Sequence, residues 1–154
     1  MNAHLRTREQ RIADTLRKLE TEVDVWVASA SEDGRANIAP LSFVWHDGAL
    51  TIAMPATSLT ARNLTRAGWA RMALGPTRDV VMLDGPIDVL PIGAVPALED
   101  AHARATGFDP REQASAYVYI RLRPERIEAW REAHELAGRQ LMEDGAWLAQ
   151  GSVT

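Results

Sequence analysis

The chain has 154 residues, no cysteine and a formal net charge of −4 at pH 7. This length fits a single domain, 1–154, whose core is large enough to fold without cross-links. The lack of cysteine excludes disulfides and thiolate metal sites, and the net negative charge argues against nucleic acid as the main partner.

The first predicted element is an amphipathic helix over residues 4–20. Leu5, Ile12, Leu16 and Leu19 recur there at helical spacing among charged residues. This pattern is typical of a helix that lies on a surface and buries one apolar face.

Three strands are predicted next, joined by two Asp-Gly turns. "VDVWVASA" (23–30) and "ANIAPLSFVWH" (36–46) flank Asp33-Gly34, and "ALTIAM" (49–54) follows Asp47-Gly48. Because Asp-Gly connections favour β-hairpins, these strands are expected to form an antiparallel meander.

A short helix and two further strands follow the meander. Ser58 is placed to cap a helix that runs to about Ala67, with Leu64 facing inward. "WARMALGP" and "RDVVMLDGPIDVL" are the next two predicted strands. Gly85-Pro86 within the second of them predicts a bulge or an edge position.

Residues 94–106 are predicted to form a helix, with Val95, Leu98 and Ala105 facing inward, and "YVYIRLR" (117–123) a sixth strand. Strands outnumber helices and mostly follow one another directly. The predicted fold class is therefore mainly β, an antiparallel β-barrel over about 23–123 with peripheral α helices.

Signals for membranes and export are missing from the sequence. Its apolar runs are far shorter than the roughly 20 residues of a membrane-spanning helix. The N-terminus has no basic start followed by an apolar stretch and a cleavage site. We therefore expect a cytoplasmic protein with no membrane and no nucleic-acid partner.

The sequence contains none of the common catalytic or metal-binding motifs. The four histidines have no metal-ligand spacing, and each is expected to be exposed or to act as a cap. No serine lies in a G-x-S-x-G context, and no P-loop or dinucleotide-binding glycine motif occurs. We predict no metal site and assign no catalytic side chain.

The polar start of the helix near residue 58 is a candidate anion site. Free N–H groups of the first turn, the hydroxyls of Thr57 and Ser58, and the guanidinium of Arg62 could converge there on a phosphate. Arg62 lies four residues after Ser58 and hence on the same helical face. The alternative is that Ser58 only caps the helix, Arg62 is solvated and Asn63 bonds to the backbone.

Several longer stretches occur in a suggestive order: "WVASASEDGRANIAPLSFVW", "TSLTARNL", "RDVVMLDGPIDV", and near the C-terminus "RPERIEAW" and "ELAGRQLMEDGAWL". Together they resemble the flavin-binding split barrels of the pyridoxamine 5'-phosphate oxidase type, including relatives that use the deazaflavin coenzyme F420. The resemblance covers about residues 23–148. It implies a six-stranded antiparallel split barrel that forms a homodimer, with residues 124–150 as a dimer and cofactor segment.

The resemblance also implies where a cofactor binds. Thr57, Ser58 and Arg62 would contact its phosphate, with Asn63 supporting the turn. Many members carry a lysine where this chain has Thr60; Thr60 could donate one hydrogen bond to the phosphate, which leaves the positive charge to Arg62. The remaining implied contacts are Pro40, Leu41 and Ser42 against the cofactor ring, and Trp130, Arg139 and Arg78 reaching over from the partner subunit. For Trp130 the alternative is an aromatic residue of a C-terminal core or dimer contact.

The function implied is an oxidoreductase that transfers hydride between bound FMN or F420 and a small organic substrate. The C-terminal stretch resembles the broad bacterial F420 group more than the vitamin-processing oxidase, which favours F420. One alternative is a non-catalytic protein that binds or stores a flavin or haem-type ligand on the same barrel. Another is a degenerate barrel, in which Thr60 marks a lost site.

Overall fold

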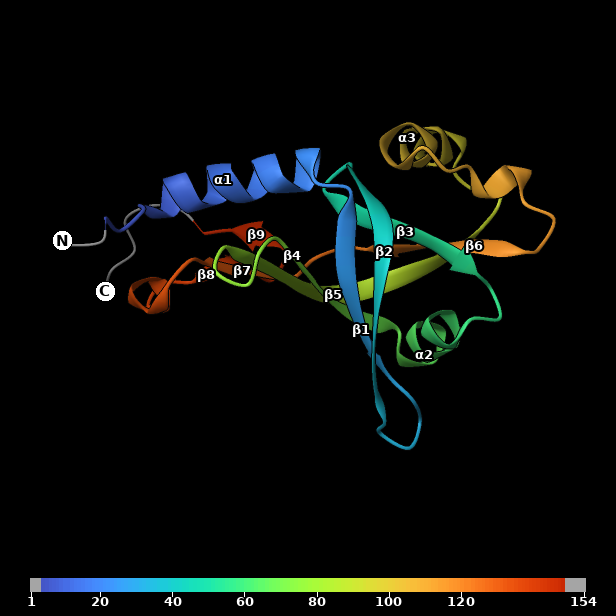
Figure 1. The fold of residues 1–154 in the computed structure, drawn as a ribbon, viewed down its shortest axis with the longest axis horizontal. Helices are drawn as coiled ribbons and strands as arrows, with labels where there is room; N and C mark the ends of the chain where they lie inside the picture. Colours follow the sequence, from blue (N-terminus) through green and yellow to red (C-terminus); the bar gives the residue numbers. More distant parts are fainter. Residues whose placement is uncertain (1–3, 149–154) are drawn as a thin grey trace.

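Six antiparallel strands close into a barrel in this computed structural model, which describes residues 4–148 (Figure 1). They are β1 (Asp24–Ala30), β2 (Ala36–His46), β3 (Ala49–Pro55), β4 (Trp69–Leu74), β5 (Val80–Pro91) and β6 (Tyr117–Leu122). Neighbours pair in the order β1, β2, β3, β6, β5, β4, and β4 pairs with β1 to close the ring. The predicted mainly β, six-stranded antiparallel split barrel is confirmed.

The first three strands form the predicted meander. Between β2 and β3, Asp47 and Gly48 have φ values of 50° and 70°, the left-handed conformation that a tight type I′ turn requires. The β1–β2 hairpin has a longer loop, in which the Ser31 N–H donates to the Arg35 carbonyl at 3.0 Å. This loop extends well beyond the barrel, next to the helix that follows β3 (Figure 1).

Strand β5 continues from the barrel into a second layer of pairing. Its second half, Ile87–Pro91, pairs with β6, whereas its first half, Val80–Asp84, pairs with β7 (Arg126–Trp130). Gly85 lies where the partner changes, and the register with β4 continues through it without a shift. The ladder with β4 thus has no bulge at Gly85-Pro86, whereas on the other side the pairing is interrupted there, since pairing with β7 ends at Asp84 and pairing with β6 begins at Ile87.

The C-terminal segment adds strands that were not predicted for residues 124–150. Strands β7, β8 (Gln140–Glu143) and β9 (Ala146–Trp147) extend the sheet away from β5. Two 3-10 turns, Pro110–Glu112 and Ala133–Glu135, precede β6 and β8. Positions 149 and 150 lie outside the described residues.

Helix α1 (Arg8–Thr21) begins later than the predicted 4–20. Thr7 caps it: its side chain accepts from the Gln10 N–H at 3.1 Å, and the Gln10 side chain accepts from the Thr7 N–H at 2.8 Å. This reciprocal capping box fixes the start of the helix, so Leu5 precedes it and is exposed. The helix lies along β7 and β8 and reaches the end of β2 (Figure 1).

The other two helices pack on the barrel. Helix α2 (Leu59–Ala67) has the predicted bounds, with Leu64 fully buried. Helix α3 (Pro96–Thr106) covers the outer face of β2, but its inward residues are Leu98, Ala101 and His102. The predicted inward position of Ala105 is wrong, since this residue is exposed.

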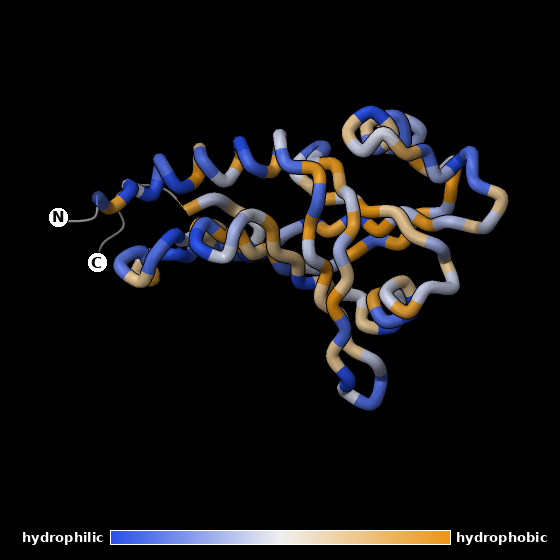
Figure 2. Tube along the Cα trace, viewed as in Figure 1, coloured by the Kyte–Doolittle hydropathy of each residue, from blue (hydrophilic) through white to orange (hydrophobic). Residues whose placement is uncertain are grey.

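Apolar side chains fill the barrel. Figure 2 shows hydrophobic residues recurring along its strands. Alternate residues of each strand point inward, and Phe43, Leu50, Ile52, Ile120 and Leu122 are completely buried there. A smaller cluster lies between α3 and the outside of the barrel, where Val44 meets the buried face of the helix. The barrel wall therefore separates two apolar layers.

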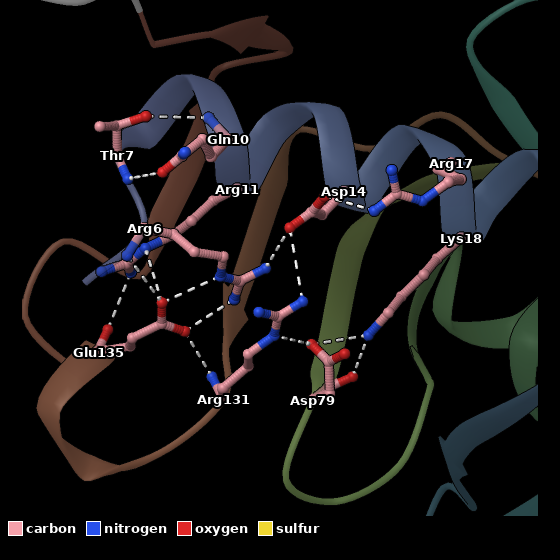
Figure 3. A network of polar contacts seen from close by, with 10 residues as sticks. All are labelled: Arg6, Thr7, Gln10, Arg11, Asp14, Arg17, Lys18, Asp79, Arg131 and Glu135. Carbon is pink, nitrogen blue, oxygen red and sulfur yellow. Dashed lines mark hydrogen bonds and ion pairs between the residues drawn. The ribbon is translucent and has the colours of Figure 1, made fainter. Parts of the chain in front are cut away.

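A network of charges fastens α1 to the loop before β8 (Figure 3). The Glu135 side chain is 1% exposed, and it accepts from Arg6 at 2.7 and 2.9 Å and from the Arg131 N–H at 2.8 Å. Arg11 lies 3.8 Å from the same carboxylate and donates to the Glu135 carbonyl at 2.9 Å. The hydrogen bonds from Arg6 lower the pKa of Glu135 to about 2. Asp79 adds a second contact to the helix, through Lys18 at 2.8 Å.

Candidate functional site

The predicted cap at the start of α2 is present. The Ser58 side chain accepts from the Ala61 N–H at 3.2 Å, and its extended backbone turns the chain from β3 into the helix. The next two N–H groups, of Leu59 and Thr60, have no intrahelical acceptor, as at every helix start. The sequence of this first turn, Leu-Thr-Ala, contains no acidic residue, so its positive end is available to an anion.

Two of the predicted phosphate residues face the barrel instead of solvent. Asn63 is buried and donates to the Ser29 hydroxyl at 3.2 Å. The buried Thr60 hydroxyl accepts from the Asn37 amide at 3.3 Å. These contacts hold α2 against β1 and β2, and they assign Thr60 a structural partner at the position where many relatives carry lysine.

Thr57 and Arg62 are the exposed members of this group. Within residues 4–148, no hydrogen bond or ion pair engages the Arg62 side chain. A guanidinium without a partner, beside free N–H groups and hydroxyls, suits a phosphate. An ordinary capped helix with a solvated arginine has the same geometry, so both interpretations of the sequence remain at this point.

A cleft of about 430 Å³ adjoins α2 and the β1–β2 hairpin. Arg35 and Asp33 of the hairpin line it together with Leu59 and Asn63 of the helix. Arg66, one turn further along, donates to the Ala30 carbonyl at 2.7 Å. Two arginines, Arg35 and Arg66, therefore lie where α2 meets the hairpin, together with the carboxylate of Asp33.

The predicted ring contacts line a different groove, of about 290 Å³, between the β2–β3 hairpin and α3. Its lining comprises Pro40, Leu41, Ser42, residues 53–55, His102, Thr106, Phe108 and Tyr117. Only the first three of these residues were predicted as site residues. The groove thus places α3 next to residues 40–42 of β2, the predicted ring contacts. This proximity of helix and strand was not predicted from the sequence.

His102 contradicts the prediction that every histidine is exposed or a cap. It is 2% exposed, and its ring meets that of Tyr119 edge-on at 5.5 Å between centroids. Burial lowers the pKa of His102 to about 4, so the imidazole is neutral at pH 7. Its position four residues after the buried Leu98 was the signal that could have placed it on the inner face of α3.

Trp130, Arg139 and Arg78 form a separate group at the end of the second layer. The Arg139 guanidinium lies 6.0 Å from the centre of the Trp130 ring and pairs with Glu128 at 2.7 Å. Arg78 pairs with Glu132 at 3.1 Å on the surface. In Figure 1, β7 and β8 lie toward the left of the molecule, whereas α2 lies to the right of its centre. Contact of these residues with a cofactor at α2 would have to come from a partner subunit, and it stays a prediction.

The family follows from comparison with known proteins. The family model for pyridoxamine 5'-phosphate oxidase matches residues 12–143, most of the chain. The chain belongs to the pyridoxamine 5'-phosphate oxidase family. Comparison with curated proteins gives no match.

Solved structures with the same fold have different ligands in their names. A haem-binding protein from Mycobacterium smegmatis is 16% identical, with a TM-score of 0.71, over 93% of this chain. The present chain covers 60% of that protein's length. An F420 reductase is 19% identical over 72% of this chain and 93% of its own, with a TM-score of 0.58. An FMN-binding, pyridoxamine 5'-phosphate oxidase-related protein from Nostoc punctiforme is 17% identical over 88% of both chains, with a TM-score of 0.59. At these identities the likeness shows the fold of the pyridoxamine 5'-phosphate oxidase family.

The described residues contain neither a cluster of metal ligands nor a membrane-spanning helix. No group of three or more potential ligand side chains is gathered there in a way that could hold a metal ion. Among the same residues, no helix combines the length and the apolar character needed to cross a bilayer.

Proposed function

We propose that this chain is a cytoplasmic, homodimeric oxidoreductase that binds FMN or F420 and transfers hydride between that cofactor and a small organic substrate. The observation that carries the proposal is the start of α2. In a chain of this family, free N–H groups and the hydroxyls of Thr57 and Ser58 lie there, one helical turn from Arg62, whose side chain has no partner among residues 4–148. This donor set fits a phosphate, which both cofactors carry.

The residues of this chain supply binding and orientation. Thr57, Ser58 and Arg62 hold the phosphate, while the Ser29–Asn63 and Asn37–Thr60 hydrogen bonds keep the helix start fixed on the barrel. Residues 40–42 of β2 would lie along the ring, with Pro40 and Ser42 on the outer face of the strand. The isoalloxazine or deazaflavin ring, when bound, supplies the hydride chemistry.

An exposed apolar face supports the homodimer. Trp26, Ile38 and Trp69 are 50%, 64% and 44% exposed on the outer side of β1, β2 and β4. The three strands are hydrogen-bonded neighbours, and Trp26 pairs directly with Pro40. Clustered large apolar side chains on one sheet face typically mark a protein interface. A second copy on this face would cover the ring strand, and its Trp130, Arg139 and Arg78 are the predicted contributors to the site.

The choice between the two cofactors follows from one pair of titrations. Purified protein is titrated separately with FMN and with F420, following tryptophan quenching and cofactor fluorescence at moderate salt. We expect F420 to bind more tightly, because Arg35 and Arg66 gather near α2, where its anionic tail could extend. Tighter binding of FMN would reverse this preference, and binding of neither would contradict the proposal.

Replacement of Arg62 by alanine is expected to weaken binding of the preferred cofactor about ten- to a hundredfold, the value of one charge-assisted hydrogen bond to phosphate. The matched control is Arg104→Ala, which removes another exposed arginine, on α3, and should leave the affinity unchanged. The measurement is the same fluorescence titration for both variants. Equal affinity of Arg62→Ala and wild type would remove Arg62 from the phosphate site and leave Ser58 as a plain cap.

A ligand carrier without catalysis is the second candidate. It is supported by the similarity to the haem-binding protein over 93% of this chain and by the absence of an assigned catalytic side chain. The two functions differ in turnover. An enzyme oxidises added reduced cofactor continuously in the presence of an acceptor, whereas a carrier binds its ligand and stops.

A further inference from the structure

The layer between α3 and the barrel contains polar groups whose bonding capacity is unused. In the described part of the chain, both ring nitrogens of His102, the Tyr119 hydroxyl and Oε2 of Glu99 are buried without a hydrogen-bond partner. The other Glu99 oxygen accepts from the Gly93 N–H at 2.8 Å, so that carboxylate is anchored at one side. Buried polar atoms in folded proteins almost always have partners, and each exception needs a cause.

Among these side chains, His102 is the one that lines the groove beside β2 and β3. Its face toward the barrel rests on the Tyr119 ring. Because burial keeps its pKa at about 4, the neutral ring offers one N–H donor and one acceptor nitrogen at pH 7. Both nitrogens are shielded from solvent, so a molecule in the groove would hydrogen-bond to one of them only after the lining side chains move apart.

The rest of the groove is apolar and uncharged. Leu41, Met54 and Phe108 contribute to its walls, and Ser42 and Thr106 are the other side chains there that carry hydroxyls besides Tyr117. No arginine, lysine, aspartate or glutamate is part of the lining. Its volume of about 290 Å³ is at the lower end of small-molecule sites, which span roughly 300–1,000 Å³. Charged ligands would therefore lose their hydration without gaining a counter-charge.

We propose that the groove between α3 and the β2–β3 hairpin binds a small, uncharged ring compound bearing a hydroxyl or carbonyl group, and that His102 is its hydrogen-bonding anchor. The compound lies against the same strand, residues 40–42, that is proposed to carry the cofactor ring. In this respect the inference rests on the proposed function: the bound compound would be the substrate that exchanges hydride. The binding itself requires no cofactor.

The test uses two probes of similar shape, 2-naphthol and 2-methylnaphthalene, which differ in one polar group. Each is titrated into the cofactor-free protein, and binding is followed by the NMR resonances of the Phe108 ring, which lines the groove and is 39% exposed. The quantity compared is the ratio of the two dissociation constants. His102→Leu is expected to shift this ratio about three- to tenfold against 2-naphthol, as loss of one neutral hydrogen bond predicts.

Two further variants make the result specific. His102→Gln keeps donor and acceptor atoms and should retain most of the preference for 2-naphthol. Tyr119→Phe removes another unpartnered polar atom of the same layer, outside the groove, and should leave the ratio unchanged. If His102→Leu does not fold, the imidazole nitrogen resonances of wild type decide, since they should shift with 2-naphthol and remain in place with 2-methylnaphthalene.

The inference is overturned if neither probe moves the Phe108 resonances, or if the ratio is the same in wild type and His102→Leu. Either result would mean that His102 takes no part in ligand binding. The outcome is separable from that of the cofactor titrations. A shifted ratio without binding of FMN or F420 would keep the groove and reject the oxidoreductase, and the reverse pattern would reject the groove alone.

Discussion

Replacing Glu135 by glutamine is expected to lower the free energy of unfolding by about 3 kcal/mol at pH 7. The carboxylate is buried between Arg6 and Arg11, and glutamine would leave the buried Arg11 without its counter-charge and Arg6 with only Asp14, at 3.1 Å. The measurement is urea unfolding of wild type and variant. The matched control is Glu132→Gln in the same loop, whose side chain is 48% exposed and pairs with the 81% exposed Arg78, so its loss should be within about 1 kcal/mol.

The pH dependence of this difference identifies its origin. The pKa of Glu135 is lowered from 4.5 to about 2 in the folded chain, so its contribution is fully present above pH 4.5 and is lost as the pH falls toward 2. Glutamine does not titrate. The stability gap between wild type and Glu135→Gln should therefore narrow across this interval. A gap that stays constant between pH 7 and pH 3 would assign the loss to packing instead of charge.

Gly85→Ala is the second substitution with a large expected effect, a loss of about 3 kcal/mol or more. A Cβ atom at Gly85 would lie 2.3 Å from the Arg123 carbonyl oxygen and 2.9 Å from the Glu125 nitrogen, both in backbone. These neighbours cannot rotate away. They are also held by hydrogen bonds on either side of Gly85, from the Arg123 N–H to Pro86 and from the Glu125 N–H to Asp84.

The appropriate control for this variant is Gly34→Ala in the β1–β2 loop. Gly34 has a φ of 83° but open space around its Cβ position, so alanine there incurs only backbone strain of about 1–2 kcal/mol. Unfolding in urea gives both values. If Gly85→Ala lowers the free energy of unfolding no more than Gly34→Ala does, the backbone between β6 and β7 can move away from the added methyl group. The close contact expected at Gly85 would then be wrong.

The barrel could be predicted because its strongest signals are local. Asp-Gly pairs fix two hairpins, and alternation within each strand gives its buried face. The C-terminal strands were missed because β8 and β9 span only 4 and 2 residues, too short for alternation to register. The start of α1 was misplaced because Leu5 has the right spacing, while the capping box at Thr7 and Gln10 decides where the helix begins.

The candidate site divides in the same way. The cap at Ser58 was predictable from its own segment, and the position of Arg62 on the outer face follows from helical spacing. The contact partners of Thr60 and Asn63 depend on strands more than 20 residues away, and spacing within one helix carries no information on them. The burial of His102 likewise depends on how α3 meets the barrel, which only the folded chain reveals.

The paths of β5 and α1 also set an order of events during synthesis on the ribosome. Once residue 122 has emerged, the barrel can close, but Val80–Asp84 then has an open hydrogen-bonding edge until β7 is made. Arg6 and Arg11 are among the first residues synthesised, but their ion pairs with Glu135 can form only after residue 135 has been made. A nascent chain stalled shortly after residue 122 would therefore expose the unpaired edge of β5, and its first helix would have the Lys18–Asp79 ion pair but not the contacts with Glu135.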